Sequence, residues 1–205
     1  LAIAPEVLLL AAALVVAMVD LWVTHPRRTP TYLLAQAALA AVAILHLLRF
    51  NDGETIYAVQ RMVVADPMGH LLAFFATIAT MVSLAYARPY AAEREMLKGE
   101  LITLAMFSLL GINVMLSANN FLVVYLGLEL MSLSLYALVA LRRDHAAATE
   151  AAMKYFVLGA LASGFLLYGL SMMYGATRSL DIAGVFNAIA TGQIDKGVMV
   201  LGIVF

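Results

Sequence analysis

Long apolar runs alternate with short polar or charged segments along the chain. A helix needs about 20 apolar residues to cross a bilayer, and six of the runs are close to that length. A further apolar run starts near residue 197. The pattern predicts an all-α fold, a polytopic transmembrane helix bundle with six full spans and the start of a seventh. The six predicted spans are 4–23, 31–49, 68–87, 101–117, 120–141 and 151–174.

Short polar segments mark the ends of these runs. Asp66 followed by Pro67 is typical of a helix start, because aspartate caps the first turn and proline fits the first helical position. Residues 118–120 form a very short link, which predicts that the helices on either side are antiparallel neighbours. Two loops have patterns of their own. Residues 56–65 are rich in β-branched residues and indicate a short hairpin, and the apolar spacing at 181–190 indicates a short helix in the membrane interface.

Composition supports an integral membrane protein, with the lipid bilayer as its surroundings. Of 205 residues, 64% are hydrophobic and only 12% are charged, the mean hydropathy is +0.96 and the net charge is −1. No basic patch indicates nucleic acid. The absence of cysteine excludes disulfides, thiolate zinc sites, iron–sulfur clusters and c-type haem on these residues. The histidines lie in four separate segments without metal-ligand spacing, so we expect no cofactor on this chain: His25, His46, His70 and His145.

Lysine and arginine are unevenly divided between alternate loops, which predicts the orientation in the membrane. One set of loops holds seven of them and the other set holds four. The richer set is expected to face the cytoplasm, and the N-terminus is then outside. The seven are Arg27, Arg28, Arg88, Arg94, Lys98, Arg142 and Arg143, and the four are Arg49, Arg61, Arg178 and Lys196.

The run 120–141 carries a single carboxylate, Glu129, near its middle. An ionisable side chain at the centre of a membrane helix costs about 3 kcal/mol or more unless something compensates it. Tyr125, Ser132 and Tyr136 lie at i−4, i+3 and i+7 from Glu129, which places all four on one helical face. Two interpretations stay open. The face either ties helices together, or it forms a proton or ion relay, which is the default for an acid inside a membrane.

Lys154 lies about one turn inside the sixth span and either snorkels to the headgroups or belongs to the same relay. At 1.5 Å per residue, it is about 10 Å from Glu129 along the membrane normal, which is too far for a salt bridge. We therefore expect Glu129 to pair with a basic residue outside this sequence. The other polar candidates, Asp20, His46 and His70, lie near span ends, where we expect them to be solvated.

The ends of the sequence predict a longer protein. The chain starts without methionine and stops inside the apolar run 197–205, which is too short to cross a bilayer. We expect the continuation to complete a seventh span that carries a lysine, because Glu129 needs a basic partner.

Several stretches share a distinctive pattern with a known family. They read YLGLELMSLSLYAL at 125–138, EAAMKYF at 150–156 and ALASGFLLYG at 160–169, and the segments 65–69 and 117–120 also fit. Together they closely resemble subunit N of the proton-pumping NADH–quinone oxidoreductase, respiratory complex I. This is one of the antiporter-like membrane subunits, and the resemblance covers most of residues 60–180.

The resemblance implies a fold built from inverted helical repeats. Residues 1–100 would supply three leading transmembrane helices with an outer loop at 50–66. Residues 101–205 would supply the first part of the first antiporter-like repeat, from its fourth transmembrane helix to the start of the seventh. Glu129 corresponds to the family's fifth-helix glutamate, and Lys154 corresponds to a sixth-helix lysine on the same hydrophilic axis.

The resemblance also implies the function. The family pumps protons through buried glutamate, lysine and water in the bacterial inner membrane, while NADH, flavin, iron–sulfur and quinone chemistry belongs to other subunits. The implied partners are therefore the other membrane subunits of complex I, and this chain is expected to bind no redox cofactor. Subunits of cation/proton antiporters and hydrogenase-linked ion pumps share the motif and form the alternative.

Overall fold

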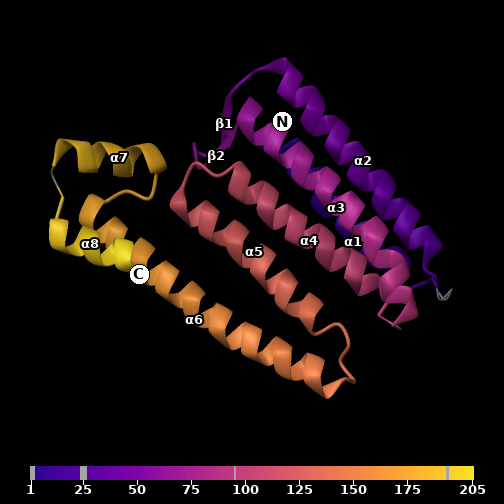
Figure 1. Cartoon of the computed structure of the whole chain (residues 1–205). Helices are drawn as coiled ribbons and strands as arrows, with labels where there is room; N and C mark the ends of the chain where they lie inside the picture. Colours follow the sequence, from indigo (N-terminus) through magenta and orange to yellow (C-terminus); the bar gives the residue numbers. More distant parts are fainter. Residues whose placement is uncertain (1–2, 24–26, 95, 193) are drawn as a thin grey trace.

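Eight α-helices and one two-stranded hairpin make up the computed structural model, which describes residues 3–23, 27–94, 96–192 and 194–205. His25 lies outside the described residues. The six longer helices lie side by side, with the hairpin at one end of the bundle, and the two short helices near the C-terminus lie beside the end of the last long helix (Figure 1). The elements are α1 (Ala4–Asp20), α2 (Thr29–Asp52), β1 (Ile56–Ala58), β2 (Val63–Ala65), α3 (Pro67–Glu93), α4 (Gly99–Leu116), α5 (Phe121–Val139), α6 (Ala146–Thr177), α7 (Ile182–Thr191) and α8 (Lys196–Val204).

Five helices, α2 to α6, are long and apolar enough to cross a membrane. The predicted span 4–23 is a helix of 17 residues that ends at Asp20, short of the usual spanning length. The carboxylate of its last residue, Asp20, pairs with Arg28, which directly precedes α2. The helix α8 lies where the seventh span was predicted to start and has nine residues. The structure therefore supports an all-helical membrane bundle with five candidate spans.

The predicted start of α3 is confirmed. The Asp66 carboxylate accepts a hydrogen bond from the Gly69 amide at 3.1 Å, and Pro67 occupies the first turn. Three other helices of the described residues start in the same way, and in α8 the Asp195 carboxylate accepts from the Gly197 amide at 3.0 Å. The Asn120 side chain accepts from the Leu122 amide at 2.9 Å, and Asp181 accepts from the Gly184 amide at 3.1 Å. Each side chain satisfies an amide that the helix itself leaves without a partner.

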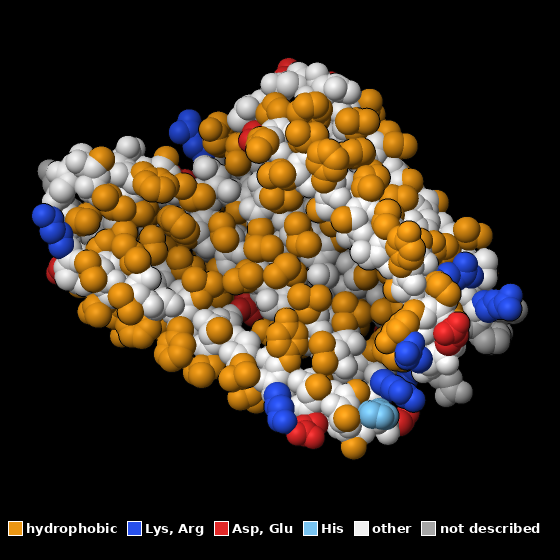
Figure 2. All heavy atoms as spheres, in the orientation of Figure 1, with side chains coloured by type: hydrophobic (Ala, Val, Ile, Leu, Met, Phe, Trp, Pro, Cys, Tyr) orange, Lys and Arg blue, Asp and Glu red, His pale blue; other side chains and the backbone are white. Residues whose placement is uncertain are grey.

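The core of the first four helices is apolar and is centred on α4. Its fully buried members come from α1, α2, α3 and α4: Leu9, Ala13, Val16, Ala35, Leu39, Val42, Leu84, Ile102, Met106, Leu109 and Leu110. Many large apolar side chains instead point away from the protein, as is expected where helices face lipid. In Figure 2, hydrophobic side chains cover most of the visible face, and charged side chains gather mainly at its edges.

The helices α4 and α5 are antiparallel neighbours, as the short link between them predicts. Their backbones approach closely at two glycines. A Cβ atom added to Gly111 would lie 2.6 Å from the Gly127 carbonyl oxygen, and one added to Gly127 would lie 2.8 Å from the Gly111 carbonyl oxygen. Only glycine fits at both positions, because any side chain would overlap with backbone of the facing helix.

The link between α4 and α5 also anchors two loops at this end of the bundle. The predicted hairpin is confirmed, with Tyr57 paired with Val64, and the Val64 amide donates to the Ser117 carbonyl at 2.8 Å. The predicted short helix is α7, which starts after Asp181. The side-chain amide of Asn119 donates to the Arg61 carbonyl at 2.8 Å and to the Asp181 carboxylate at 3.3 Å. Asn119 therefore joins the hairpin to the start of α7.

The close α4–α5 crossing gives a first prediction. Gly127→Ala is expected to lower the free energy of unfolding by about 1–3 kcal/mol, because the added methyl group forces the two backbones apart. Gly175→Ala is the matched control, since a Cβ there would have its nearest neighbour at an ordinary 3.9 Å. Thermal unfolding of the purified protein in detergent compares the two variants. Equal midpoints for both would contradict the argument.

Candidate functional site

The polar face of α5 lies against α6. At its first turn the Tyr125 hydroxyl is 3.5 Å from the Ser163 hydroxyl oxygen, which donates to it. Near its last turn, the Tyr136 ring lies against Gly159, where an added Cβ would overlap with the Tyr136 hydroxyl. The antiparallel register of α5 and α6 is therefore fixed at two points, one on each side of Glu129.

Tyr136 also makes the aromatic contacts of this helix pair. Its ring meets Tyr155 edge-on at a centroid distance of 4.8 Å and Phe156 at 5.7 Å. Such edge-to-face pairs contribute about 0.5–1.5 kcal/mol each beyond the burial of area. Of the four residues that the sequence places on one face, Tyr136 thus has a clear packing role, and Tyr125 links the two helices through its hydroxyl.

Glu129 is half-buried in the middle of α5, between these two contacts. Within the described residues, its carboxylate forms no hydrogen bond and no ion pair. Ser132 is also half-buried, one turn further along. Gly127, which packs on α4, lies on the opposite face of the helix, because two residues correspond to a rotation of about 200°. The single acid of this helix therefore faces the α5–α6 boundary and not α4.

Lys154 does not contact Glu129. Its ammonium group donates to the Glu150 carboxylate at 2.6 Å, one turn earlier on α6, and both side chains are exposed. An exposed i,i+4 pair of this kind contributes only about 0.3–0.5 kcal/mol. The lysine is therefore free to exchange its partner, and the structure does not bring the two predicted ionisable residues together.

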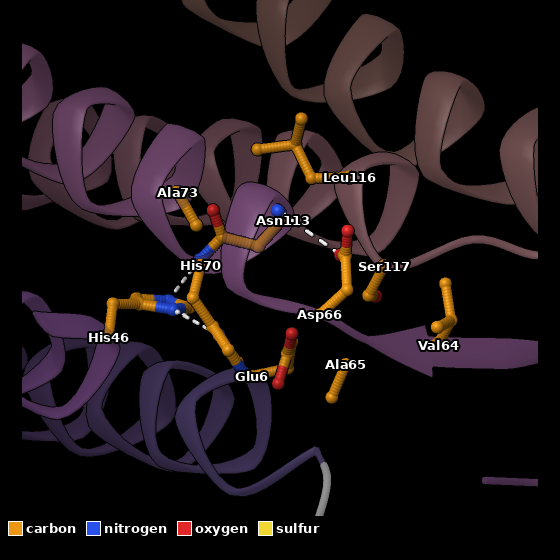
Figure 3. Close-up of a pocket in the computed structure, with 11 residues that line it drawn as sticks. Glu6, His46, Val64, Ala65, Asp66, His70, Ala73, Asn113, Leu116 and Ser117 are labelled. Carbon is orange, nitrogen blue, oxygen red and sulfur yellow. Dashed lines mark hydrogen bonds between the residues drawn. The ribbon is translucent and has the colours of Figure 1, made fainter. Parts of the chain in front are cut away.

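The expectation that His46 and His70 are solvated is wrong. Their side chains are 1% and 6% exposed, and their Nδ1 atoms are 3.2 Å apart in the interior of the leading bundle. Asn113 and Glu6, which sequence reasoning overlooked, lie beside them (Figure 3). The sequence did contain a signal for these four residues, since each of them is a polar residue inside an otherwise apolar run. Their meeting depends on the relative register of four helices.

Asp20 is also less solvated than expected. Its carboxylate pairs with Arg28 and accepts a hydrogen bond from the Thr31 hydroxyl at 3.1 Å. It borders a cavity of about 680 Å³ between the ends of α1, α4 and α5 that lie opposite the hairpin. Glu100 and Arg143, which form an exposed ion pair at 2.6 Å, line the same cavity. Charged groups therefore have access to water at this end of the bundle.

Metal binding finds no support in the described part of the chain, where no group of three or more histidine, aspartate or glutamate side chains is arranged to hold an ion.

Sequence comparison places the chain among antiporter-like membrane proteins. A family model described as "NADH:quinone oxidoreductase/Mrp antiporter, TM" matches residues 118–205. The NADH-quinone oxidoreductase subunit N of Polaromonas naphthalenivorans is 60% identical over 205 residues, covering 100% of this chain. That of Herminiimonas arsenicoxydans is 54% identical and covers 98%. This chain is therefore similar to the subunit N family along its whole length. It spans 41% and 42% of the lengths of these two relatives.

Solved structures share the fold seen here. The chain matches a chain of respiratory complex I from Thermus thermophilus with a TM-score of 0.74 at 24% identity, over 97% of this chain and 42% of the other. It also matches a chain of an archaeal membrane-bound sulfane sulfur reductase with a TM-score of 0.76 at 20% identity, over 98% and 42% of the two chains. At these identities the likeness concerns the fold alone.

The contacts of Tyr136 give a second prediction. Tyr136→Phe keeps both edge-to-face contacts and is expected to change the free energy of unfolding by less than about 0.5 kcal/mol. Tyr136→Ala removes both pairs and is expected to cost about 1–3 kcal/mol. Thermal unfolding of the reconstituted protein measures the difference. An equally large loss in Tyr136→Phe would show that the hydroxyl, and not the ring, holds α5 to α6.

Proposed function

We propose that this chain is part of a proton-translocating membrane subunit of NADH–quinone oxidoreductase. Electron transfer from NADH to quinone in other subunits would drive protons through buried glutamate, lysine and water in this one. The observation that carries the proposal is Glu129, a half-buried acid without a partner among the described residues, at the centre of an apolar helix. An ionisable residue inside a membrane costs free energy, so it is expected to have a functional role. The 60% identity to a curated subunit N supports the same conclusion.

We infer the division of the chain from the same family. Residues 1–100 form three leading transmembrane helices with an outer loop at 50–66. Residues 101–205 begin the first antiporter-like repeat, up to the start of its seventh transmembrane helix. In this arrangement α1 is the first of six spans, α8 opens the next, and the N-terminus lies outside the inner membrane. The uneven division of lysine and arginine supports that orientation.

Glu129 and Lys154 are proposed as stations of one proton path. Glu129 faces α6, and the Tyr125–Ser163 hydroxyl pair lies one turn away. Lys154 lies on α6 toward the opposite end from that pair and has only an exposed partner. When a proton moves at one station, the proton affinity of the other shifts, and each pKa unit corresponds to about 1.4 kcal/mol. Tyr125, Ser132 and Tyr136 are weaker candidates, because two of them already have packing roles.

The chemistry of electron transfer is assigned to other subunits. This chain would contact other membrane subunits of complex I and the lipid bilayer, and it would bind no NADH, flavin, iron–sulfur cluster or other redox cofactor. The lack of cysteine supports this assignment for iron–sulfur clusters, whose ligands are thiolates.

A subunit of a cation/proton antiporter or hydrogenase-linked ion pump remains the alternative, because the matching family model includes the Mrp antiporter. The curated relatives favour the first proposal. Isolation from native membranes separates the two. Co-purification with an NADH-oxidising complex supports the first, and cation/proton exchange without redox partners supports the second.

Substitution of Glu129 gives a third prediction. Glu129→Gln keeps the shape and removes the charge, so we expect normal assembly with impaired pumping, by about tenfold if the charge shifts its partner's proton affinity by one pKa unit. Lys154→Ala is expected to do less harm, because water can replace a lysine near a helix end, and Lys154→Arg is expected to be mild. Protons pumped per electron pair are measured in reconstituted vesicles, together with the amount of assembled complex.

Two outcomes would contradict this prediction. Full pumping by Glu129→Gln would exclude an essential charge at this position. Loss of pumping only in proportion to lost assembly would favour a structural role, since replacing a buried charge by a neutral group of similar shape can leave stability unchanged or raised.

The proposed orientation gives a fourth prediction. The chain lacks cysteine, so single cysteines can be placed in exposed loops on opposite sides. In right-side-out vesicles, an impermeant thiol reagent is expected to label Thr55→Cys, beside the hairpin, and to leave His145→Cys, between α5 and α6, unlabelled. The reverse pattern would place the N-terminus inside. Labelling of both from one side would mean that the number of spans between them is even.

A further inference from the structure

Four polar side chains from four helices meet at the end of the leading bundle that carries the hairpin (Figure 3). They are Glu6 of α1, His46 of α2, His70 of α3 and Asn113 of α4, and we name them the histidine cluster. The two imidazole rings and the amide are nearly inaccessible, at 1%, 6% and 1% exposed for His46, His70 and Asn113. Burial of so many polar groups is costly unless they are hydrogen-bonded.

The hydrogen bonds of the cluster form a chain that can run in two directions. The Nδ1 atoms of His46 and His70 are 3.2 Å apart, and Asn113 Nδ2 is 3.4 Å from His46 Nε2. If Asn113 donates to His46, then His46 Nδ1–H donates to His70 Nδ1. If the Asn113 amide is rotated, each bond reverses, and His46 Nε2–H donates to the amide oxygen. Both arrangements leave the two rings in place and differ only in the proton positions and in the rotation of the amide, because a neutral imidazole has one donor and one acceptor.

Two polar atoms of the cluster have no partner among the described residues, Oδ1 of Asn113 and Oε2 of Glu6. Rotation of the Asn113 amide does not resolve this, because it leaves the amide nitrogen unpaired instead. Both residues line the same small cavity, which offers about 10 Å³ to a water centre. This is about the room that one water molecule needs, and a water there would have several polar neighbours.

His70 connects this cavity to the surface. The same side chain borders a second small hollow lined by Arg49, Asp52 and Glu54, which belong to the end of α2 and the following loop. Asp52 and Glu54 are exposed to solvent. The charged groups around the cluster are therefore Glu6 on the α1 side, Arg49 and Asp52 on the α2 side, Glu54 in the loop, and Asp66 at the start of α3.

We propose that the histidine cluster is a buried site that holds one water molecule and one exchangeable proton, with His70 as its connection to the hairpin side. A proton from bulk water forms an N–H bond at His70 Nε2. The Nδ1 proton of His70 then moves to His46 Nδ1. As the Asn113 amide rotates, the Nε2 proton of His46 leaves through the cavity water to the Glu6 carboxylate, and the amide nitrogen then donates to His46 Nε2. The chain of hydrogen bonds is left in its other direction, with one proton taken up.

This site is separate from the Glu129 face, because it is built from α1 to α4 and Glu129 faces α6. The inference therefore does not depend on the proposed pumping function. Full pumping by Glu129→Gln would not contradict the inference about the histidine cluster. The discovery of a different coupled ion would not contradict it either.

The test is nitrogen NMR of the full-length protein with ¹⁵N-labelled histidine in lipid vesicles. A scalar coupling across the N–H···N bond identifies the two Nδ1 atoms in the wild-type protein. We expect the signals of both rings to change together between about pH 4 and pH 9, a range that brackets ordinary histidine titration. The His46 signal is expected to lose this response in His70→Asn, because the connection to the surface is broken. His145→Asn, at an exposed loop, is the matched control and is expected to leave the pair's response unchanged.

Two results would overturn the proposal. Signals that stay constant over the whole pH range in the wild-type protein would mean a purely structural cluster with fixed tautomers. An unchanged response of His46 in His70→Asn would mean that protons reach the cluster by another route. The first result is read from the wild-type protein, so the test decides even if the variant fails to fold.

Discussion

Gly111 and Gly127 bring the backbones of α4 and α5 into direct contact, and the positions of the other helices follow from this crossing. With one face of α5 committed to α4, the opposite face, which carries Glu129, is left for α6. The remaining surface of α4 packs against α1, α2 and α3. Packing without side chains between the helices is typical of membrane proteins, where small residues allow close approach and dispersion replaces the hydrophobic effect. One contact between two glycines therefore separates the Glu129 face from the leading helices.

Glu129 and the histidine cluster are the two polar regions on either side of α4, and they differ in what offsets the free-energy cost of burying their polar groups. Glu129 is only half-buried and has no partner among the described residues, so its charge must be balanced by water or by a group outside them. The histidine cluster is more deeply buried, and its rings and the Asn113 amide bond to one another, while Asn113 Oδ1 and Glu6 Oε2 have no partner among the described residues. The hydrogen-bonded network offsets part of the cost of burying its polar groups, whereas an unpaired acid depends on the charges around it.

Local signals in the sequence predicted much of the fold. The cap at Asp66, the hairpin, the helix α7 and the antiparallel pair α4–α5 could all be predicted, because each depends on residues close together in the chain. The spacing around Glu129 also placed Tyr125 and Tyr136 on one face. The histidine cluster could not be predicted, because His46, His70, Glu6 and Asn113 meet only in one register of four helices. Their closeness to a span end made the histidines look solvated, although residues of the hairpin line the cavity at that end.

Asn119 has a consequence for how the protein is made. Its side chain bonds to Arg61, 58 residues earlier, and to Asp181, 62 residues later. Because the chain is made from its N-terminus, the hairpin is complete before Asp181 exists, and the second bond can form only once α6 has been made. The Asn119 side chain is therefore fixed in two stages, first by the hairpin and then by the start of α7. A chain that ends before residue 181 would hold the α4–α5 link by the hairpin side alone.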